Sequence, residues 1–133
     1  MLVFFNTNVL VSAFLARGLC ADLLRLVLTE HTLVTSEVVL DELRDVLSRK
    51  GGMPPAQIEA IETFLRDQPI APRPAQTLQL GLVDGDDEWV VASAVLIEAD
   101  LFVTGDQGVL ACTTTPLPLL NPRGCWEHLR GAG

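Results

Sequence analysis

The sequence predicts an α/β protein, a three-layer α/β/α sandwich with a central, mostly parallel sheet. Short continuous apolar runs, such as residues 2–5, are typical of strands that are buried on both faces. These runs alternate with segments of helical periodicity, as in folds with crossover helices. The segment 88–98 is apolar on nearly every side, which is typical of a helix packed between layers.

The first half of the chain alternates strands and helices. Ser36 is a good N-cap, Gly51 and Gly52 stop the helix that follows it, and Pro55 suits the first turn of the next helix. The elements expected here are strands at 2–5 and 32–35 and helices at 9–15, 20–28, 36–48 and 55–67.

The second half continues the alternation after a proline-rich stretch. A turn at 84–87 precedes the apolar helix, and a short helical turn follows the next strand. The elements expected here are a loop with a short edge strand at 69–74, a helix at 88–98, strands at 101–103 and 117–120, and a terminal helix at 122–130.

Length and composition indicate one globular domain over residues 1–133. Hydrophobic residues make up 49% of the 133 residues, which excludes disorder as the main state. No apolar run reaches the roughly 18 residues of a membrane span, and the start lacks a secretory signal. The three cysteines fit neither a disulfide framework nor a paired zinc motif, so we expect a reducing cytoplasm.

The net charge of −8 argues against a protein that wraps DNA by electrostatics. It does not exclude nucleic acid, because a divalent cation held by acidic residues inverts the local charge. Eight of the nine cationic residues are arginines, which suit phosphate contacts, although solvated surface positions are the simpler interpretation.

Two polar clusters follow predicted strands, at the ends where α/β sheets bind ligands. Asn6, Thr7 and Asn8 follow the first strand, and the segment 104–106 follows the strand at 101–103. Each cluster has a plain alternative, because Asn and Asp after a strand often only cap the next helix. If the two strands are neighbours, the clusters meet.

Glu42 and the segment 84–87 add further acids. On a helical wheel of about 100° per residue, Glu42 falls between Val38 and Val46, inside the apolar arc. A carboxylate there needs an arginine partner, a place at the rim or a metal. Helix capping explains one of Asp84, Asp86 and Asp87 well, but it explains three poorly.

Clustered carboxylates favour a hard cation such as Mg²⁺ or Mn²⁺ between them. Such ions activate water and stabilise the leaving oxygen of a phosphodiester, which predicts metal-dependent hydrolysis of a phosphate ester. Other chemistries lack support. The two histidines have no GxSxG partner, phosphate-binding glycine loops are missing, and the aromatic residues are too few for a base-stacking platform.

Four segments resemble, in order, the motifs of PIN-domain proteins, and most closely the VapC-like ribonuclease toxins of bacterial toxin–antitoxin modules. The segments are 4–13, 35–43, 84–94 and 103–106. The resemblance implies cleavage of RNA with Mg²⁺ or Mn²⁺, an antitoxin protein as partner, and a homodimer. By position it assigns the catalytic, metal-binding acids Glu42, Asp87 and Asp106, with Asp84 as an extra ligand and Thr104, Thr7 and Asn8 in support.

The chain departs from the family at two positions. Asn6 stands where the family has an aspartate, so the ligand there keeps an oxygen but brings no charge, and we expect weaker metal binding and slower chemistry. An engineered inactivation, a natural loss of activity and a site that tolerates Asn all remain open. Gly108 stands where relatives often carry a further acid.

Two other functions compete with a ribonuclease. A catalytically inactive PIN-like module would bind RNA or a protein through the same cleft, and Asn6 favours it. A phosphatase of the haloacid dehalogenase type would share the strand-end spacing of residues 5–8, but both acids of its motif are missing. Its phosphate-binding lysine would have to be Lys50, which is poorly placed after a helix.

Overall fold

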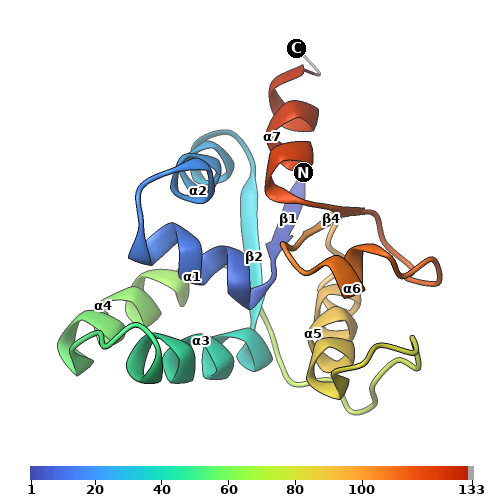
Figure 1. Ribbon diagram of the computed structural model, residues 1–133, viewed down its shortest axis with the longest axis horizontal. Helices are drawn as coiled ribbons and strands as arrows, with labels where there is room; N and C mark the ends of the chain where they lie inside the picture. Colours follow the sequence, from blue (N-terminus) through green and yellow to red (C-terminus); the bar gives the residue numbers. More distant parts are fainter. Residues whose placement is uncertain (132–133) are drawn as a thin grey trace.

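The computed structural model describes residues 1–131 and shows a five-stranded sheet with helices on both faces (Figure 1). The strands are β1 (Leu2–Phe5), β2 (Thr32–Ser36), β3 (Ile70–Ala71), β4 (Leu101–Val103) and β5 (Leu119–Leu120). The helices are α1 (Thr7–Leu15), α2 (Leu19–Glu30), α3 (Glu37–Arg49), α4 (Pro55–Leu65), α5 (Gly85–Leu96), α6 (Gln107–Leu110) and α7 (Pro122–Gly131).

The sheet has the order β3-β2-β1-β4-β5, and every pairing in it is parallel. The chain therefore runs outward from β1 through β2 to β3 and then returns to place β4 on the other side of β1. This reversal creates a switch point between β1 and β4, where open α/β sheets bind their ligands. The α/β prediction is confirmed, and the sheet is wholly rather than mostly parallel.

The core forms where the inner strands meet the helices. Val3, Phe4 and Phe5 of β1 and Phe102 of β4 have no exposed surface. The rings of Phe4 and Phe102 stack with their centroids 5.4 Å apart. Figure 1 shows α1 to α4 on one side of the sheet and α5 and α6 on the other.

Several elements differ at their ends from the sequence prediction because polar side chains cap them earlier. The helix expected at 9–15 begins at Thr7, since Asn6 is its N-cap. The helix expected at 88–98 spans Gly85–Leu96, with Asp84 as N-cap. That helix is not covered on every side as a helix packed between layers would be, because its apolar residues Trp89 and Leu96 are 37% and 50% exposed.

The remaining boundary differences are small. The helix expected at 20–28 spans Leu19–Glu30, and the helix expected at 55–67 ends at Leu65. The last strand contains only Leu119–Leu120. Cys20, Cys112 and Cys125 are free thiols. None of the helices within residues 1–131 is long and apolar enough to cross a membrane.

Candidate active site

The carboxyl ends of β1 and β4 bring the two predicted polar clusters together. Phe5 pairs with Val103, so the residues that follow them, Asn6 and Thr104, lie side by side. The backbone N–H of Asn6 continues the ladder and donates to the carbonyl of Val103 at 2.8 Å. The sequence left open whether these two strands are neighbours, and the structure shows that they are.

Thr104 is the centre of the hydrogen bonds at this end of the sheet. Its buried Oγ1 accepts from Asn6 Nδ2 at 2.9 Å, from Asn8 Nδ2 at 3.3 Å and from the backbone N–H of Asp106 at 3.1 Å. Asn8 Oδ1 in turn accepts from the Gly105 N–H at 3.1 Å. These bonds fix the loop that carries Asp106 against the start of α1.

Asn6 is only 4% exposed, and both ends of its amide are engaged. Its Oδ1 accepts from the Thr7 N–H at 2.8 Å while its Nδ2 donates to Thr104. A carboxylate at this position has no proton to donate, so it would accept a hydrogen bond from the Thr104 hydroxyl instead. The asparagine thus reverses the direction of a buried hydrogen bond at the switch point.

Glu42 projects from α3 toward these strand ends and is half-buried. The Thr7 hydroxyl donates to Glu42 Oε1 at 3.2 Å. Burial, together with the negative charges of Asp86, Asp87 and Asp84, raises the pKa of Glu42 to about 7, although the Thr7 hydrogen bond acts in the opposite direction. Ionisation of Glu42 at this position inside the apolar arc therefore costs free energy.

Asp87, in the first turn of α5, is in the same situation. Burial, reinforced by the charges of Asp84, Asp106 and Asp86, raises its pKa to about 6. Asp84 caps the helix by accepting from the Asp86 N–H at 2.9 Å, so it has the structural role that the capping alternative foresaw. Capping does not account for Asp87, which lies within electrostatic reach of acids from two other segments.

Asp106 combines capping with a place beside the acids. Its Oδ1 accepts from the backbone N–H groups of Gly108 at 2.8 Å and Val109 at 3.2 Å at the start of α6. A Cβ atom at Gly108 would lie 3.1 Å from that same oxygen, so a side chain there would require Asp106 to shift slightly. The glycine at position 108, where relatives often carry an acid, thus leaves room for the observed orientation of Asp106.

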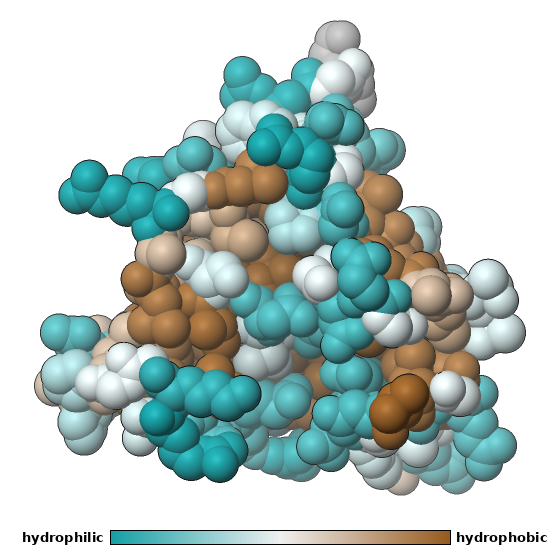
Figure 2. All heavy atoms as spheres, in the orientation of Figure 1, coloured by the Kyte–Doolittle hydropathy of each residue, from teal (hydrophilic) through white to brown (hydrophobic). Residues whose placement is uncertain are grey.

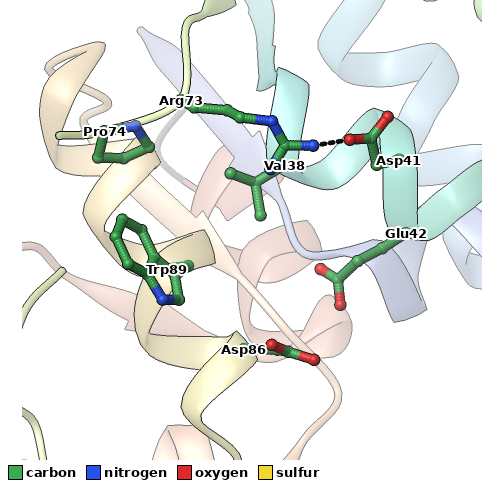
Figure 3. Close-up of a pocket in the computed structure, with 7 residues that line it drawn as sticks. All are labelled: Val38, Asp41, Glu42, Arg73, Pro74, Asp86 and Trp89. Carbon is green, nitrogen blue, oxygen red and sulfur yellow. Dashed lines mark ion pairs between the residues drawn. The ribbon is translucent and has the colours of Figure 1, made fainter. Parts of the chain in front are cut away.

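The acids line hollows on the molecular surface. Asp84, Asp87 and Asp106 share a hollow of about 260 Å³ with the loop before α5 and with α6. Glu42 and Asp86 line a neighbouring pocket of about 360 Å³ between α3 and α5 (Figure 3). In Figure 2 hydrophilic side chains occupy the middle of the face, where α1 and α6 begin, and hydrophobic ones gather on either side.

The donor set fits Mg²⁺ or Mn²⁺ in its chemistry, because every candidate ligand offers oxygen. Burial and the neighbouring acids raise the pKa values of Glu42 and Asp87, and a cation bound between these carboxyl groups would favour their charged forms. Within residues 1–131, no three His, Cys, Asp or Glu side chains are close enough to hold one metal ion together. A cation would therefore have to draw the carboxylates inward by side-chain rotation.

The structure thus gathers all the residues selected from the sequence at one end of the sheet. Sequence reasoning noticed Asp86 but did not assign it to the site, and it missed Trp89 and Arg73; all three line the pocket beside Glu42. Asp86 and Trp89 are three residues apart on α5 and share a helix face, a spacing that the sequence already contained. Arg73 had no local signal, because only the position of the loop after β3 brings it to α3.

Comparison with known proteins agrees with this fold and motif order. A family model described as PIN domain matches residues 2–108. A chain in the crystal structure of VapBC2 from Rickettsia felis, bound to a DNA fragment from their promoter, is similar at a TM-score of 0.66. The identity is 20%, over 91% of this chain and 98% of that chain.

A chain in the 2.2 Å structure of VapBC-1 from nontypeable Haemophilus influenzae is similar at a TM-score of 0.63. The identity is 18%, over 92% of this chain and 99% of that one. Comparison with curated protein sequences gives no match. Similarity to solved structures at this level of identity concerns the fold, whereas the family model covers most of the chain and all four motif segments. The chain belongs to the PIN-domain family.

Proposed function

We propose that this protein is a metal-dependent endoribonuclease, the toxin of a toxin–antitoxin module, with activity reduced by Asn6. One observation carries the proposal: Glu42, Asp87 and Asp106, from three separate elements, gather at the switch point of a PIN fold. Two of these carboxyl groups have raised pKa values because they are partly buried and because neighbouring acids add their negative charge. A site with no cationic ligand has little reason to collect half-buried acids.

The residues take distinct roles in this proposal. Glu42, Asp87 and Asp106 would hold Mg²⁺ or Mn²⁺, with Asp84 and the Asn6 amide as further oxygen ligands. A bound divalent cation would activate water and offset the charge of the phosphodiester. The supporting residues Thr7, Asn8 and Thr104 orient these ligands: Thr7 bonds Glu42, and Thr104 fixes the loop of Asp106.

Asn6 lowers the attraction for a cation in two ways. It removes one negative charge, worth about 4 kcal/mol for a charge pair at 4 Å and an effective dielectric of about 20, partly offset by weaker repulsion among the remaining acids. It also directs an amide N–H toward Thr104, so the oxygen is turned to the Thr7 backbone.

The partners follow from the relatives. Both structural neighbours are VapBC assemblies. We therefore propose a protein antitoxin for this chain, together with homodimerisation, an RNA substrate and a cytoplasmic location. Residues 1–133 would act as a single domain.

RNA cleavage tests the proposal. We expect Asn6→Asp to raise cleavage in Mg²⁺ or Mn²⁺ by at least about tenfold over the parent chain, since it restores a charged ligand. EDTA should abolish the gain, and Asp106→Ala added to Asn6→Asp should abolish it as well. The assay uses structured and single-stranded RNAs resolved on denaturing gels. Equal, metal-independent rates in all three proteins would contradict the proposal.

A second function, an inactive PIN-like module that binds RNA or a protein, is favoured by Asn6 itself. Its amide is buried, and both its oxygen and its nitrogen form a hydrogen bond within the protein, so the position has partners without a metal. Tight RNA binding by both the parent and Asn6→Asp, without cleavage by either, would support this second function over the first.

A further inference from the structure

The pocket between α3 and α5 carries an aromatic side chain that the core does not use. Trp89 is 37% exposed, whereas Phe4, Phe5 and Phe102 have no exposed surface. Figure 3 shows its indole ring at the wall of the pocket, below Pro74 and across from Glu42. The pocket, of about 360 Å³, lies near the lower end of the range of small-molecule sites, about 300–1,000 Å³.

We propose, on the basis of the ribonuclease function above, that this pocket receives one unpaired nucleobase of the RNA, stacked on Trp89. Aromatic side chains bind bases of any sequence because every base has a π-face. Val38 and Pro74 add further apolar wall. Because Glu42 lines this pocket and also belongs to the acid cluster, a base held here places its own backbone beside the proposed cleavage site.

The charges of the pocket favour a base over a phosphate inside it. Glu42 and Asp86 lie on the side opposite Arg73 (Figure 3). Carboxylates repel a phosphate group but accept hydrogen bonds from the N–H groups on a base edge. The occupant of the pocket should therefore be the base, with the sugar–phosphate backbone outside.

Arg73 lies at the rim, where that backbone would pass. Its guanidinium forms an ion pair with Asp41 and its side chain remains 60% exposed. A guanidinium has five N–H donors, so the pair with Asp41 leaves donors for a phosphate oxygen. The ion pair also holds the arginine in place before RNA binds, which reduces the entropy lost on binding.

Fluorescence of a single tryptophan tests this proposal directly. The chain has two tryptophans, and Trp126 lies on α7, outside the residues that line the pocket. Trp126→Phe therefore leaves Trp89 as the only indole reporter. It is titrated in Mg²⁺ with a single-stranded RNA of mixed sequence and with an oligomer of equal length and charge built from abasic residues. Gels confirm that the RNA stays intact.

We expect the RNA to quench the emission of Trp89 and the abasic oligomer to leave it unchanged. Trp89→Ala should weaken RNA binding by about 5- to 150-fold, the range for one base stacked on an aromatic ring, without affecting the abasic oligomer. Trp89→Phe should retain most of the affinity. Thermal melts by circular dichroism verify that both variants fold.

The failures of the two proposals are distinguishable. RNA that binds without quenching, or a Trp89→Ala variant that binds RNA as tightly as the parent, overturns the base pocket while the ribonuclease proposal stands. If Trp89→Ala lost equal affinity for the RNA and for the abasic oligomer, the substitution would act through the structure. That result would also overturn the base pocket and would favour a protein partner as its occupant. If neither oligomer binds, the ribonuclease proposal fails as well.

Discussion

Asn6 illustrates how one side chain can be well satisfied in the fold and poorly suited to catalysis. Its amide caps α1 through Thr7 and bonds Thr104 across the strand ends. Three N–H groups converge on Thr104 Oγ1, although a hydroxyl oxygen has two lone pairs. An aspartate would relieve this excess of donors by accepting from the Thr104 hydroxyl. The same change would restore a negative charge beside the acid cluster.

Glu42 is the opposite case: it suits the proposed catalysis, but its negative charge destabilises the metal-free protein. Its pKa rises to about 7 from an ordinary 4.5, mainly through burial and further through neighbouring acids. The folded state thus binds a proton more tightly than the unfolded state. The corresponding stability is fully present below about pH 4.5 and is lost as the pH rises through about 7.

Glu42→Gln should therefore stabilise the metal-free protein at high pH. The glutamine keeps the shape and the acceptor for Thr7, but it cannot ionise. We expect the free energy of unfolding in EDTA to rise by about 2 kcal/mol at pH 8, allowing for solvent screening, and to change little at pH 4.5. Urea unfolding at both values measures it, with Glu59→Gln at an exposed position of α4 as matched control. A gain that is equal at both pH values would contradict the assigned cause.

At the scale of elements, the site depends on how α3 and α5 are held beside the strand ends, because α3 carries Glu42 and α5 carries Asp87. Ser36, the N-cap of α3, and Ser93 of α5 are both fully buried, and their hydroxyl oxygens are 2.8 Å apart. Ser93 Oγ also lies 2.7 Å from the Val90 carbonyl oxygen. This pair of hydroxyls is a buried polar link between the two acid-bearing helices.

Ser93→Ala should weaken that link. The change removes the Ser93 contact of the buried Ser36 hydroxyl, which keeps only the N-cap hydrogen bond from the Val39 N–H, and we expect a loss of about 1–2 kcal/mol in the free energy of unfolding. Urea unfolding measures this loss. Ser48→Ala, on the exposed side of α3, is the matched control and should change stability by less than about 0.5 kcal/mol. Equal effects of the two substitutions would show that the buried pair contributes nothing specific.

A second link holds α3 to α4 on the outer side. Arg66, the C-cap of α4, bonds both oxygens of Glu37 at 2.9 Å and also Glu62 at 3.1 Å. Arg44 joins the same Glu62 at 2.8 Å and Asp41 at 3.3 Å. These arginines have structural partners, so the simpler interpretation of surface arginines holds for them. Arg73 differs because its own side chain lines the pocket, together with its partner Asp41.

For the whole molecule, the sequence predicted what depends on local pattern. Each buried apolar run, in β1, β2 and β4, has one good interpretation as a strand, and each helical periodicity has one as a helix. The positions where these strands end were predicted from the same runs. Element ends were less accurate: Asn6 and Asp84 begin α1 and α5 earlier than apolar periodicity suggests. Edge strands β3 and β5 are two residues long, and only their pairing with β2 and β4 defines them.

The candidate site divides in the same way. Asn6 and Asp106 were found because they follow strands, and Glu42 because it interrupts an apolar pattern. Asp87 was found because helix capping explains the clustered acids at 84–87 poorly. The electrostatic coupling of Glu42 to Asp86, and the approach of Arg73 to α3, depend on tertiary packing that no local pattern encodes. The pocket around Trp89 therefore became visible only in the folded protein.

In the proposed function, the acids at the switch point form a divalent-cation site that Asn6 weakens. Calorimetric titration with Mn²⁺ at pH 7.5 measures this directly for the parent chain, Asn6→Asp, and Asn6→Asp with Asp106→Ala. We predict that Asn6→Asp binds Mn²⁺ at least about tenfold more tightly than the parent, about 1.4 kcal/mol, and that the added Asp106→Ala removes the gain. Equal affinities for the parent and Asn6→Asp, or a gain that survives loss of Asp106, would contradict the claim.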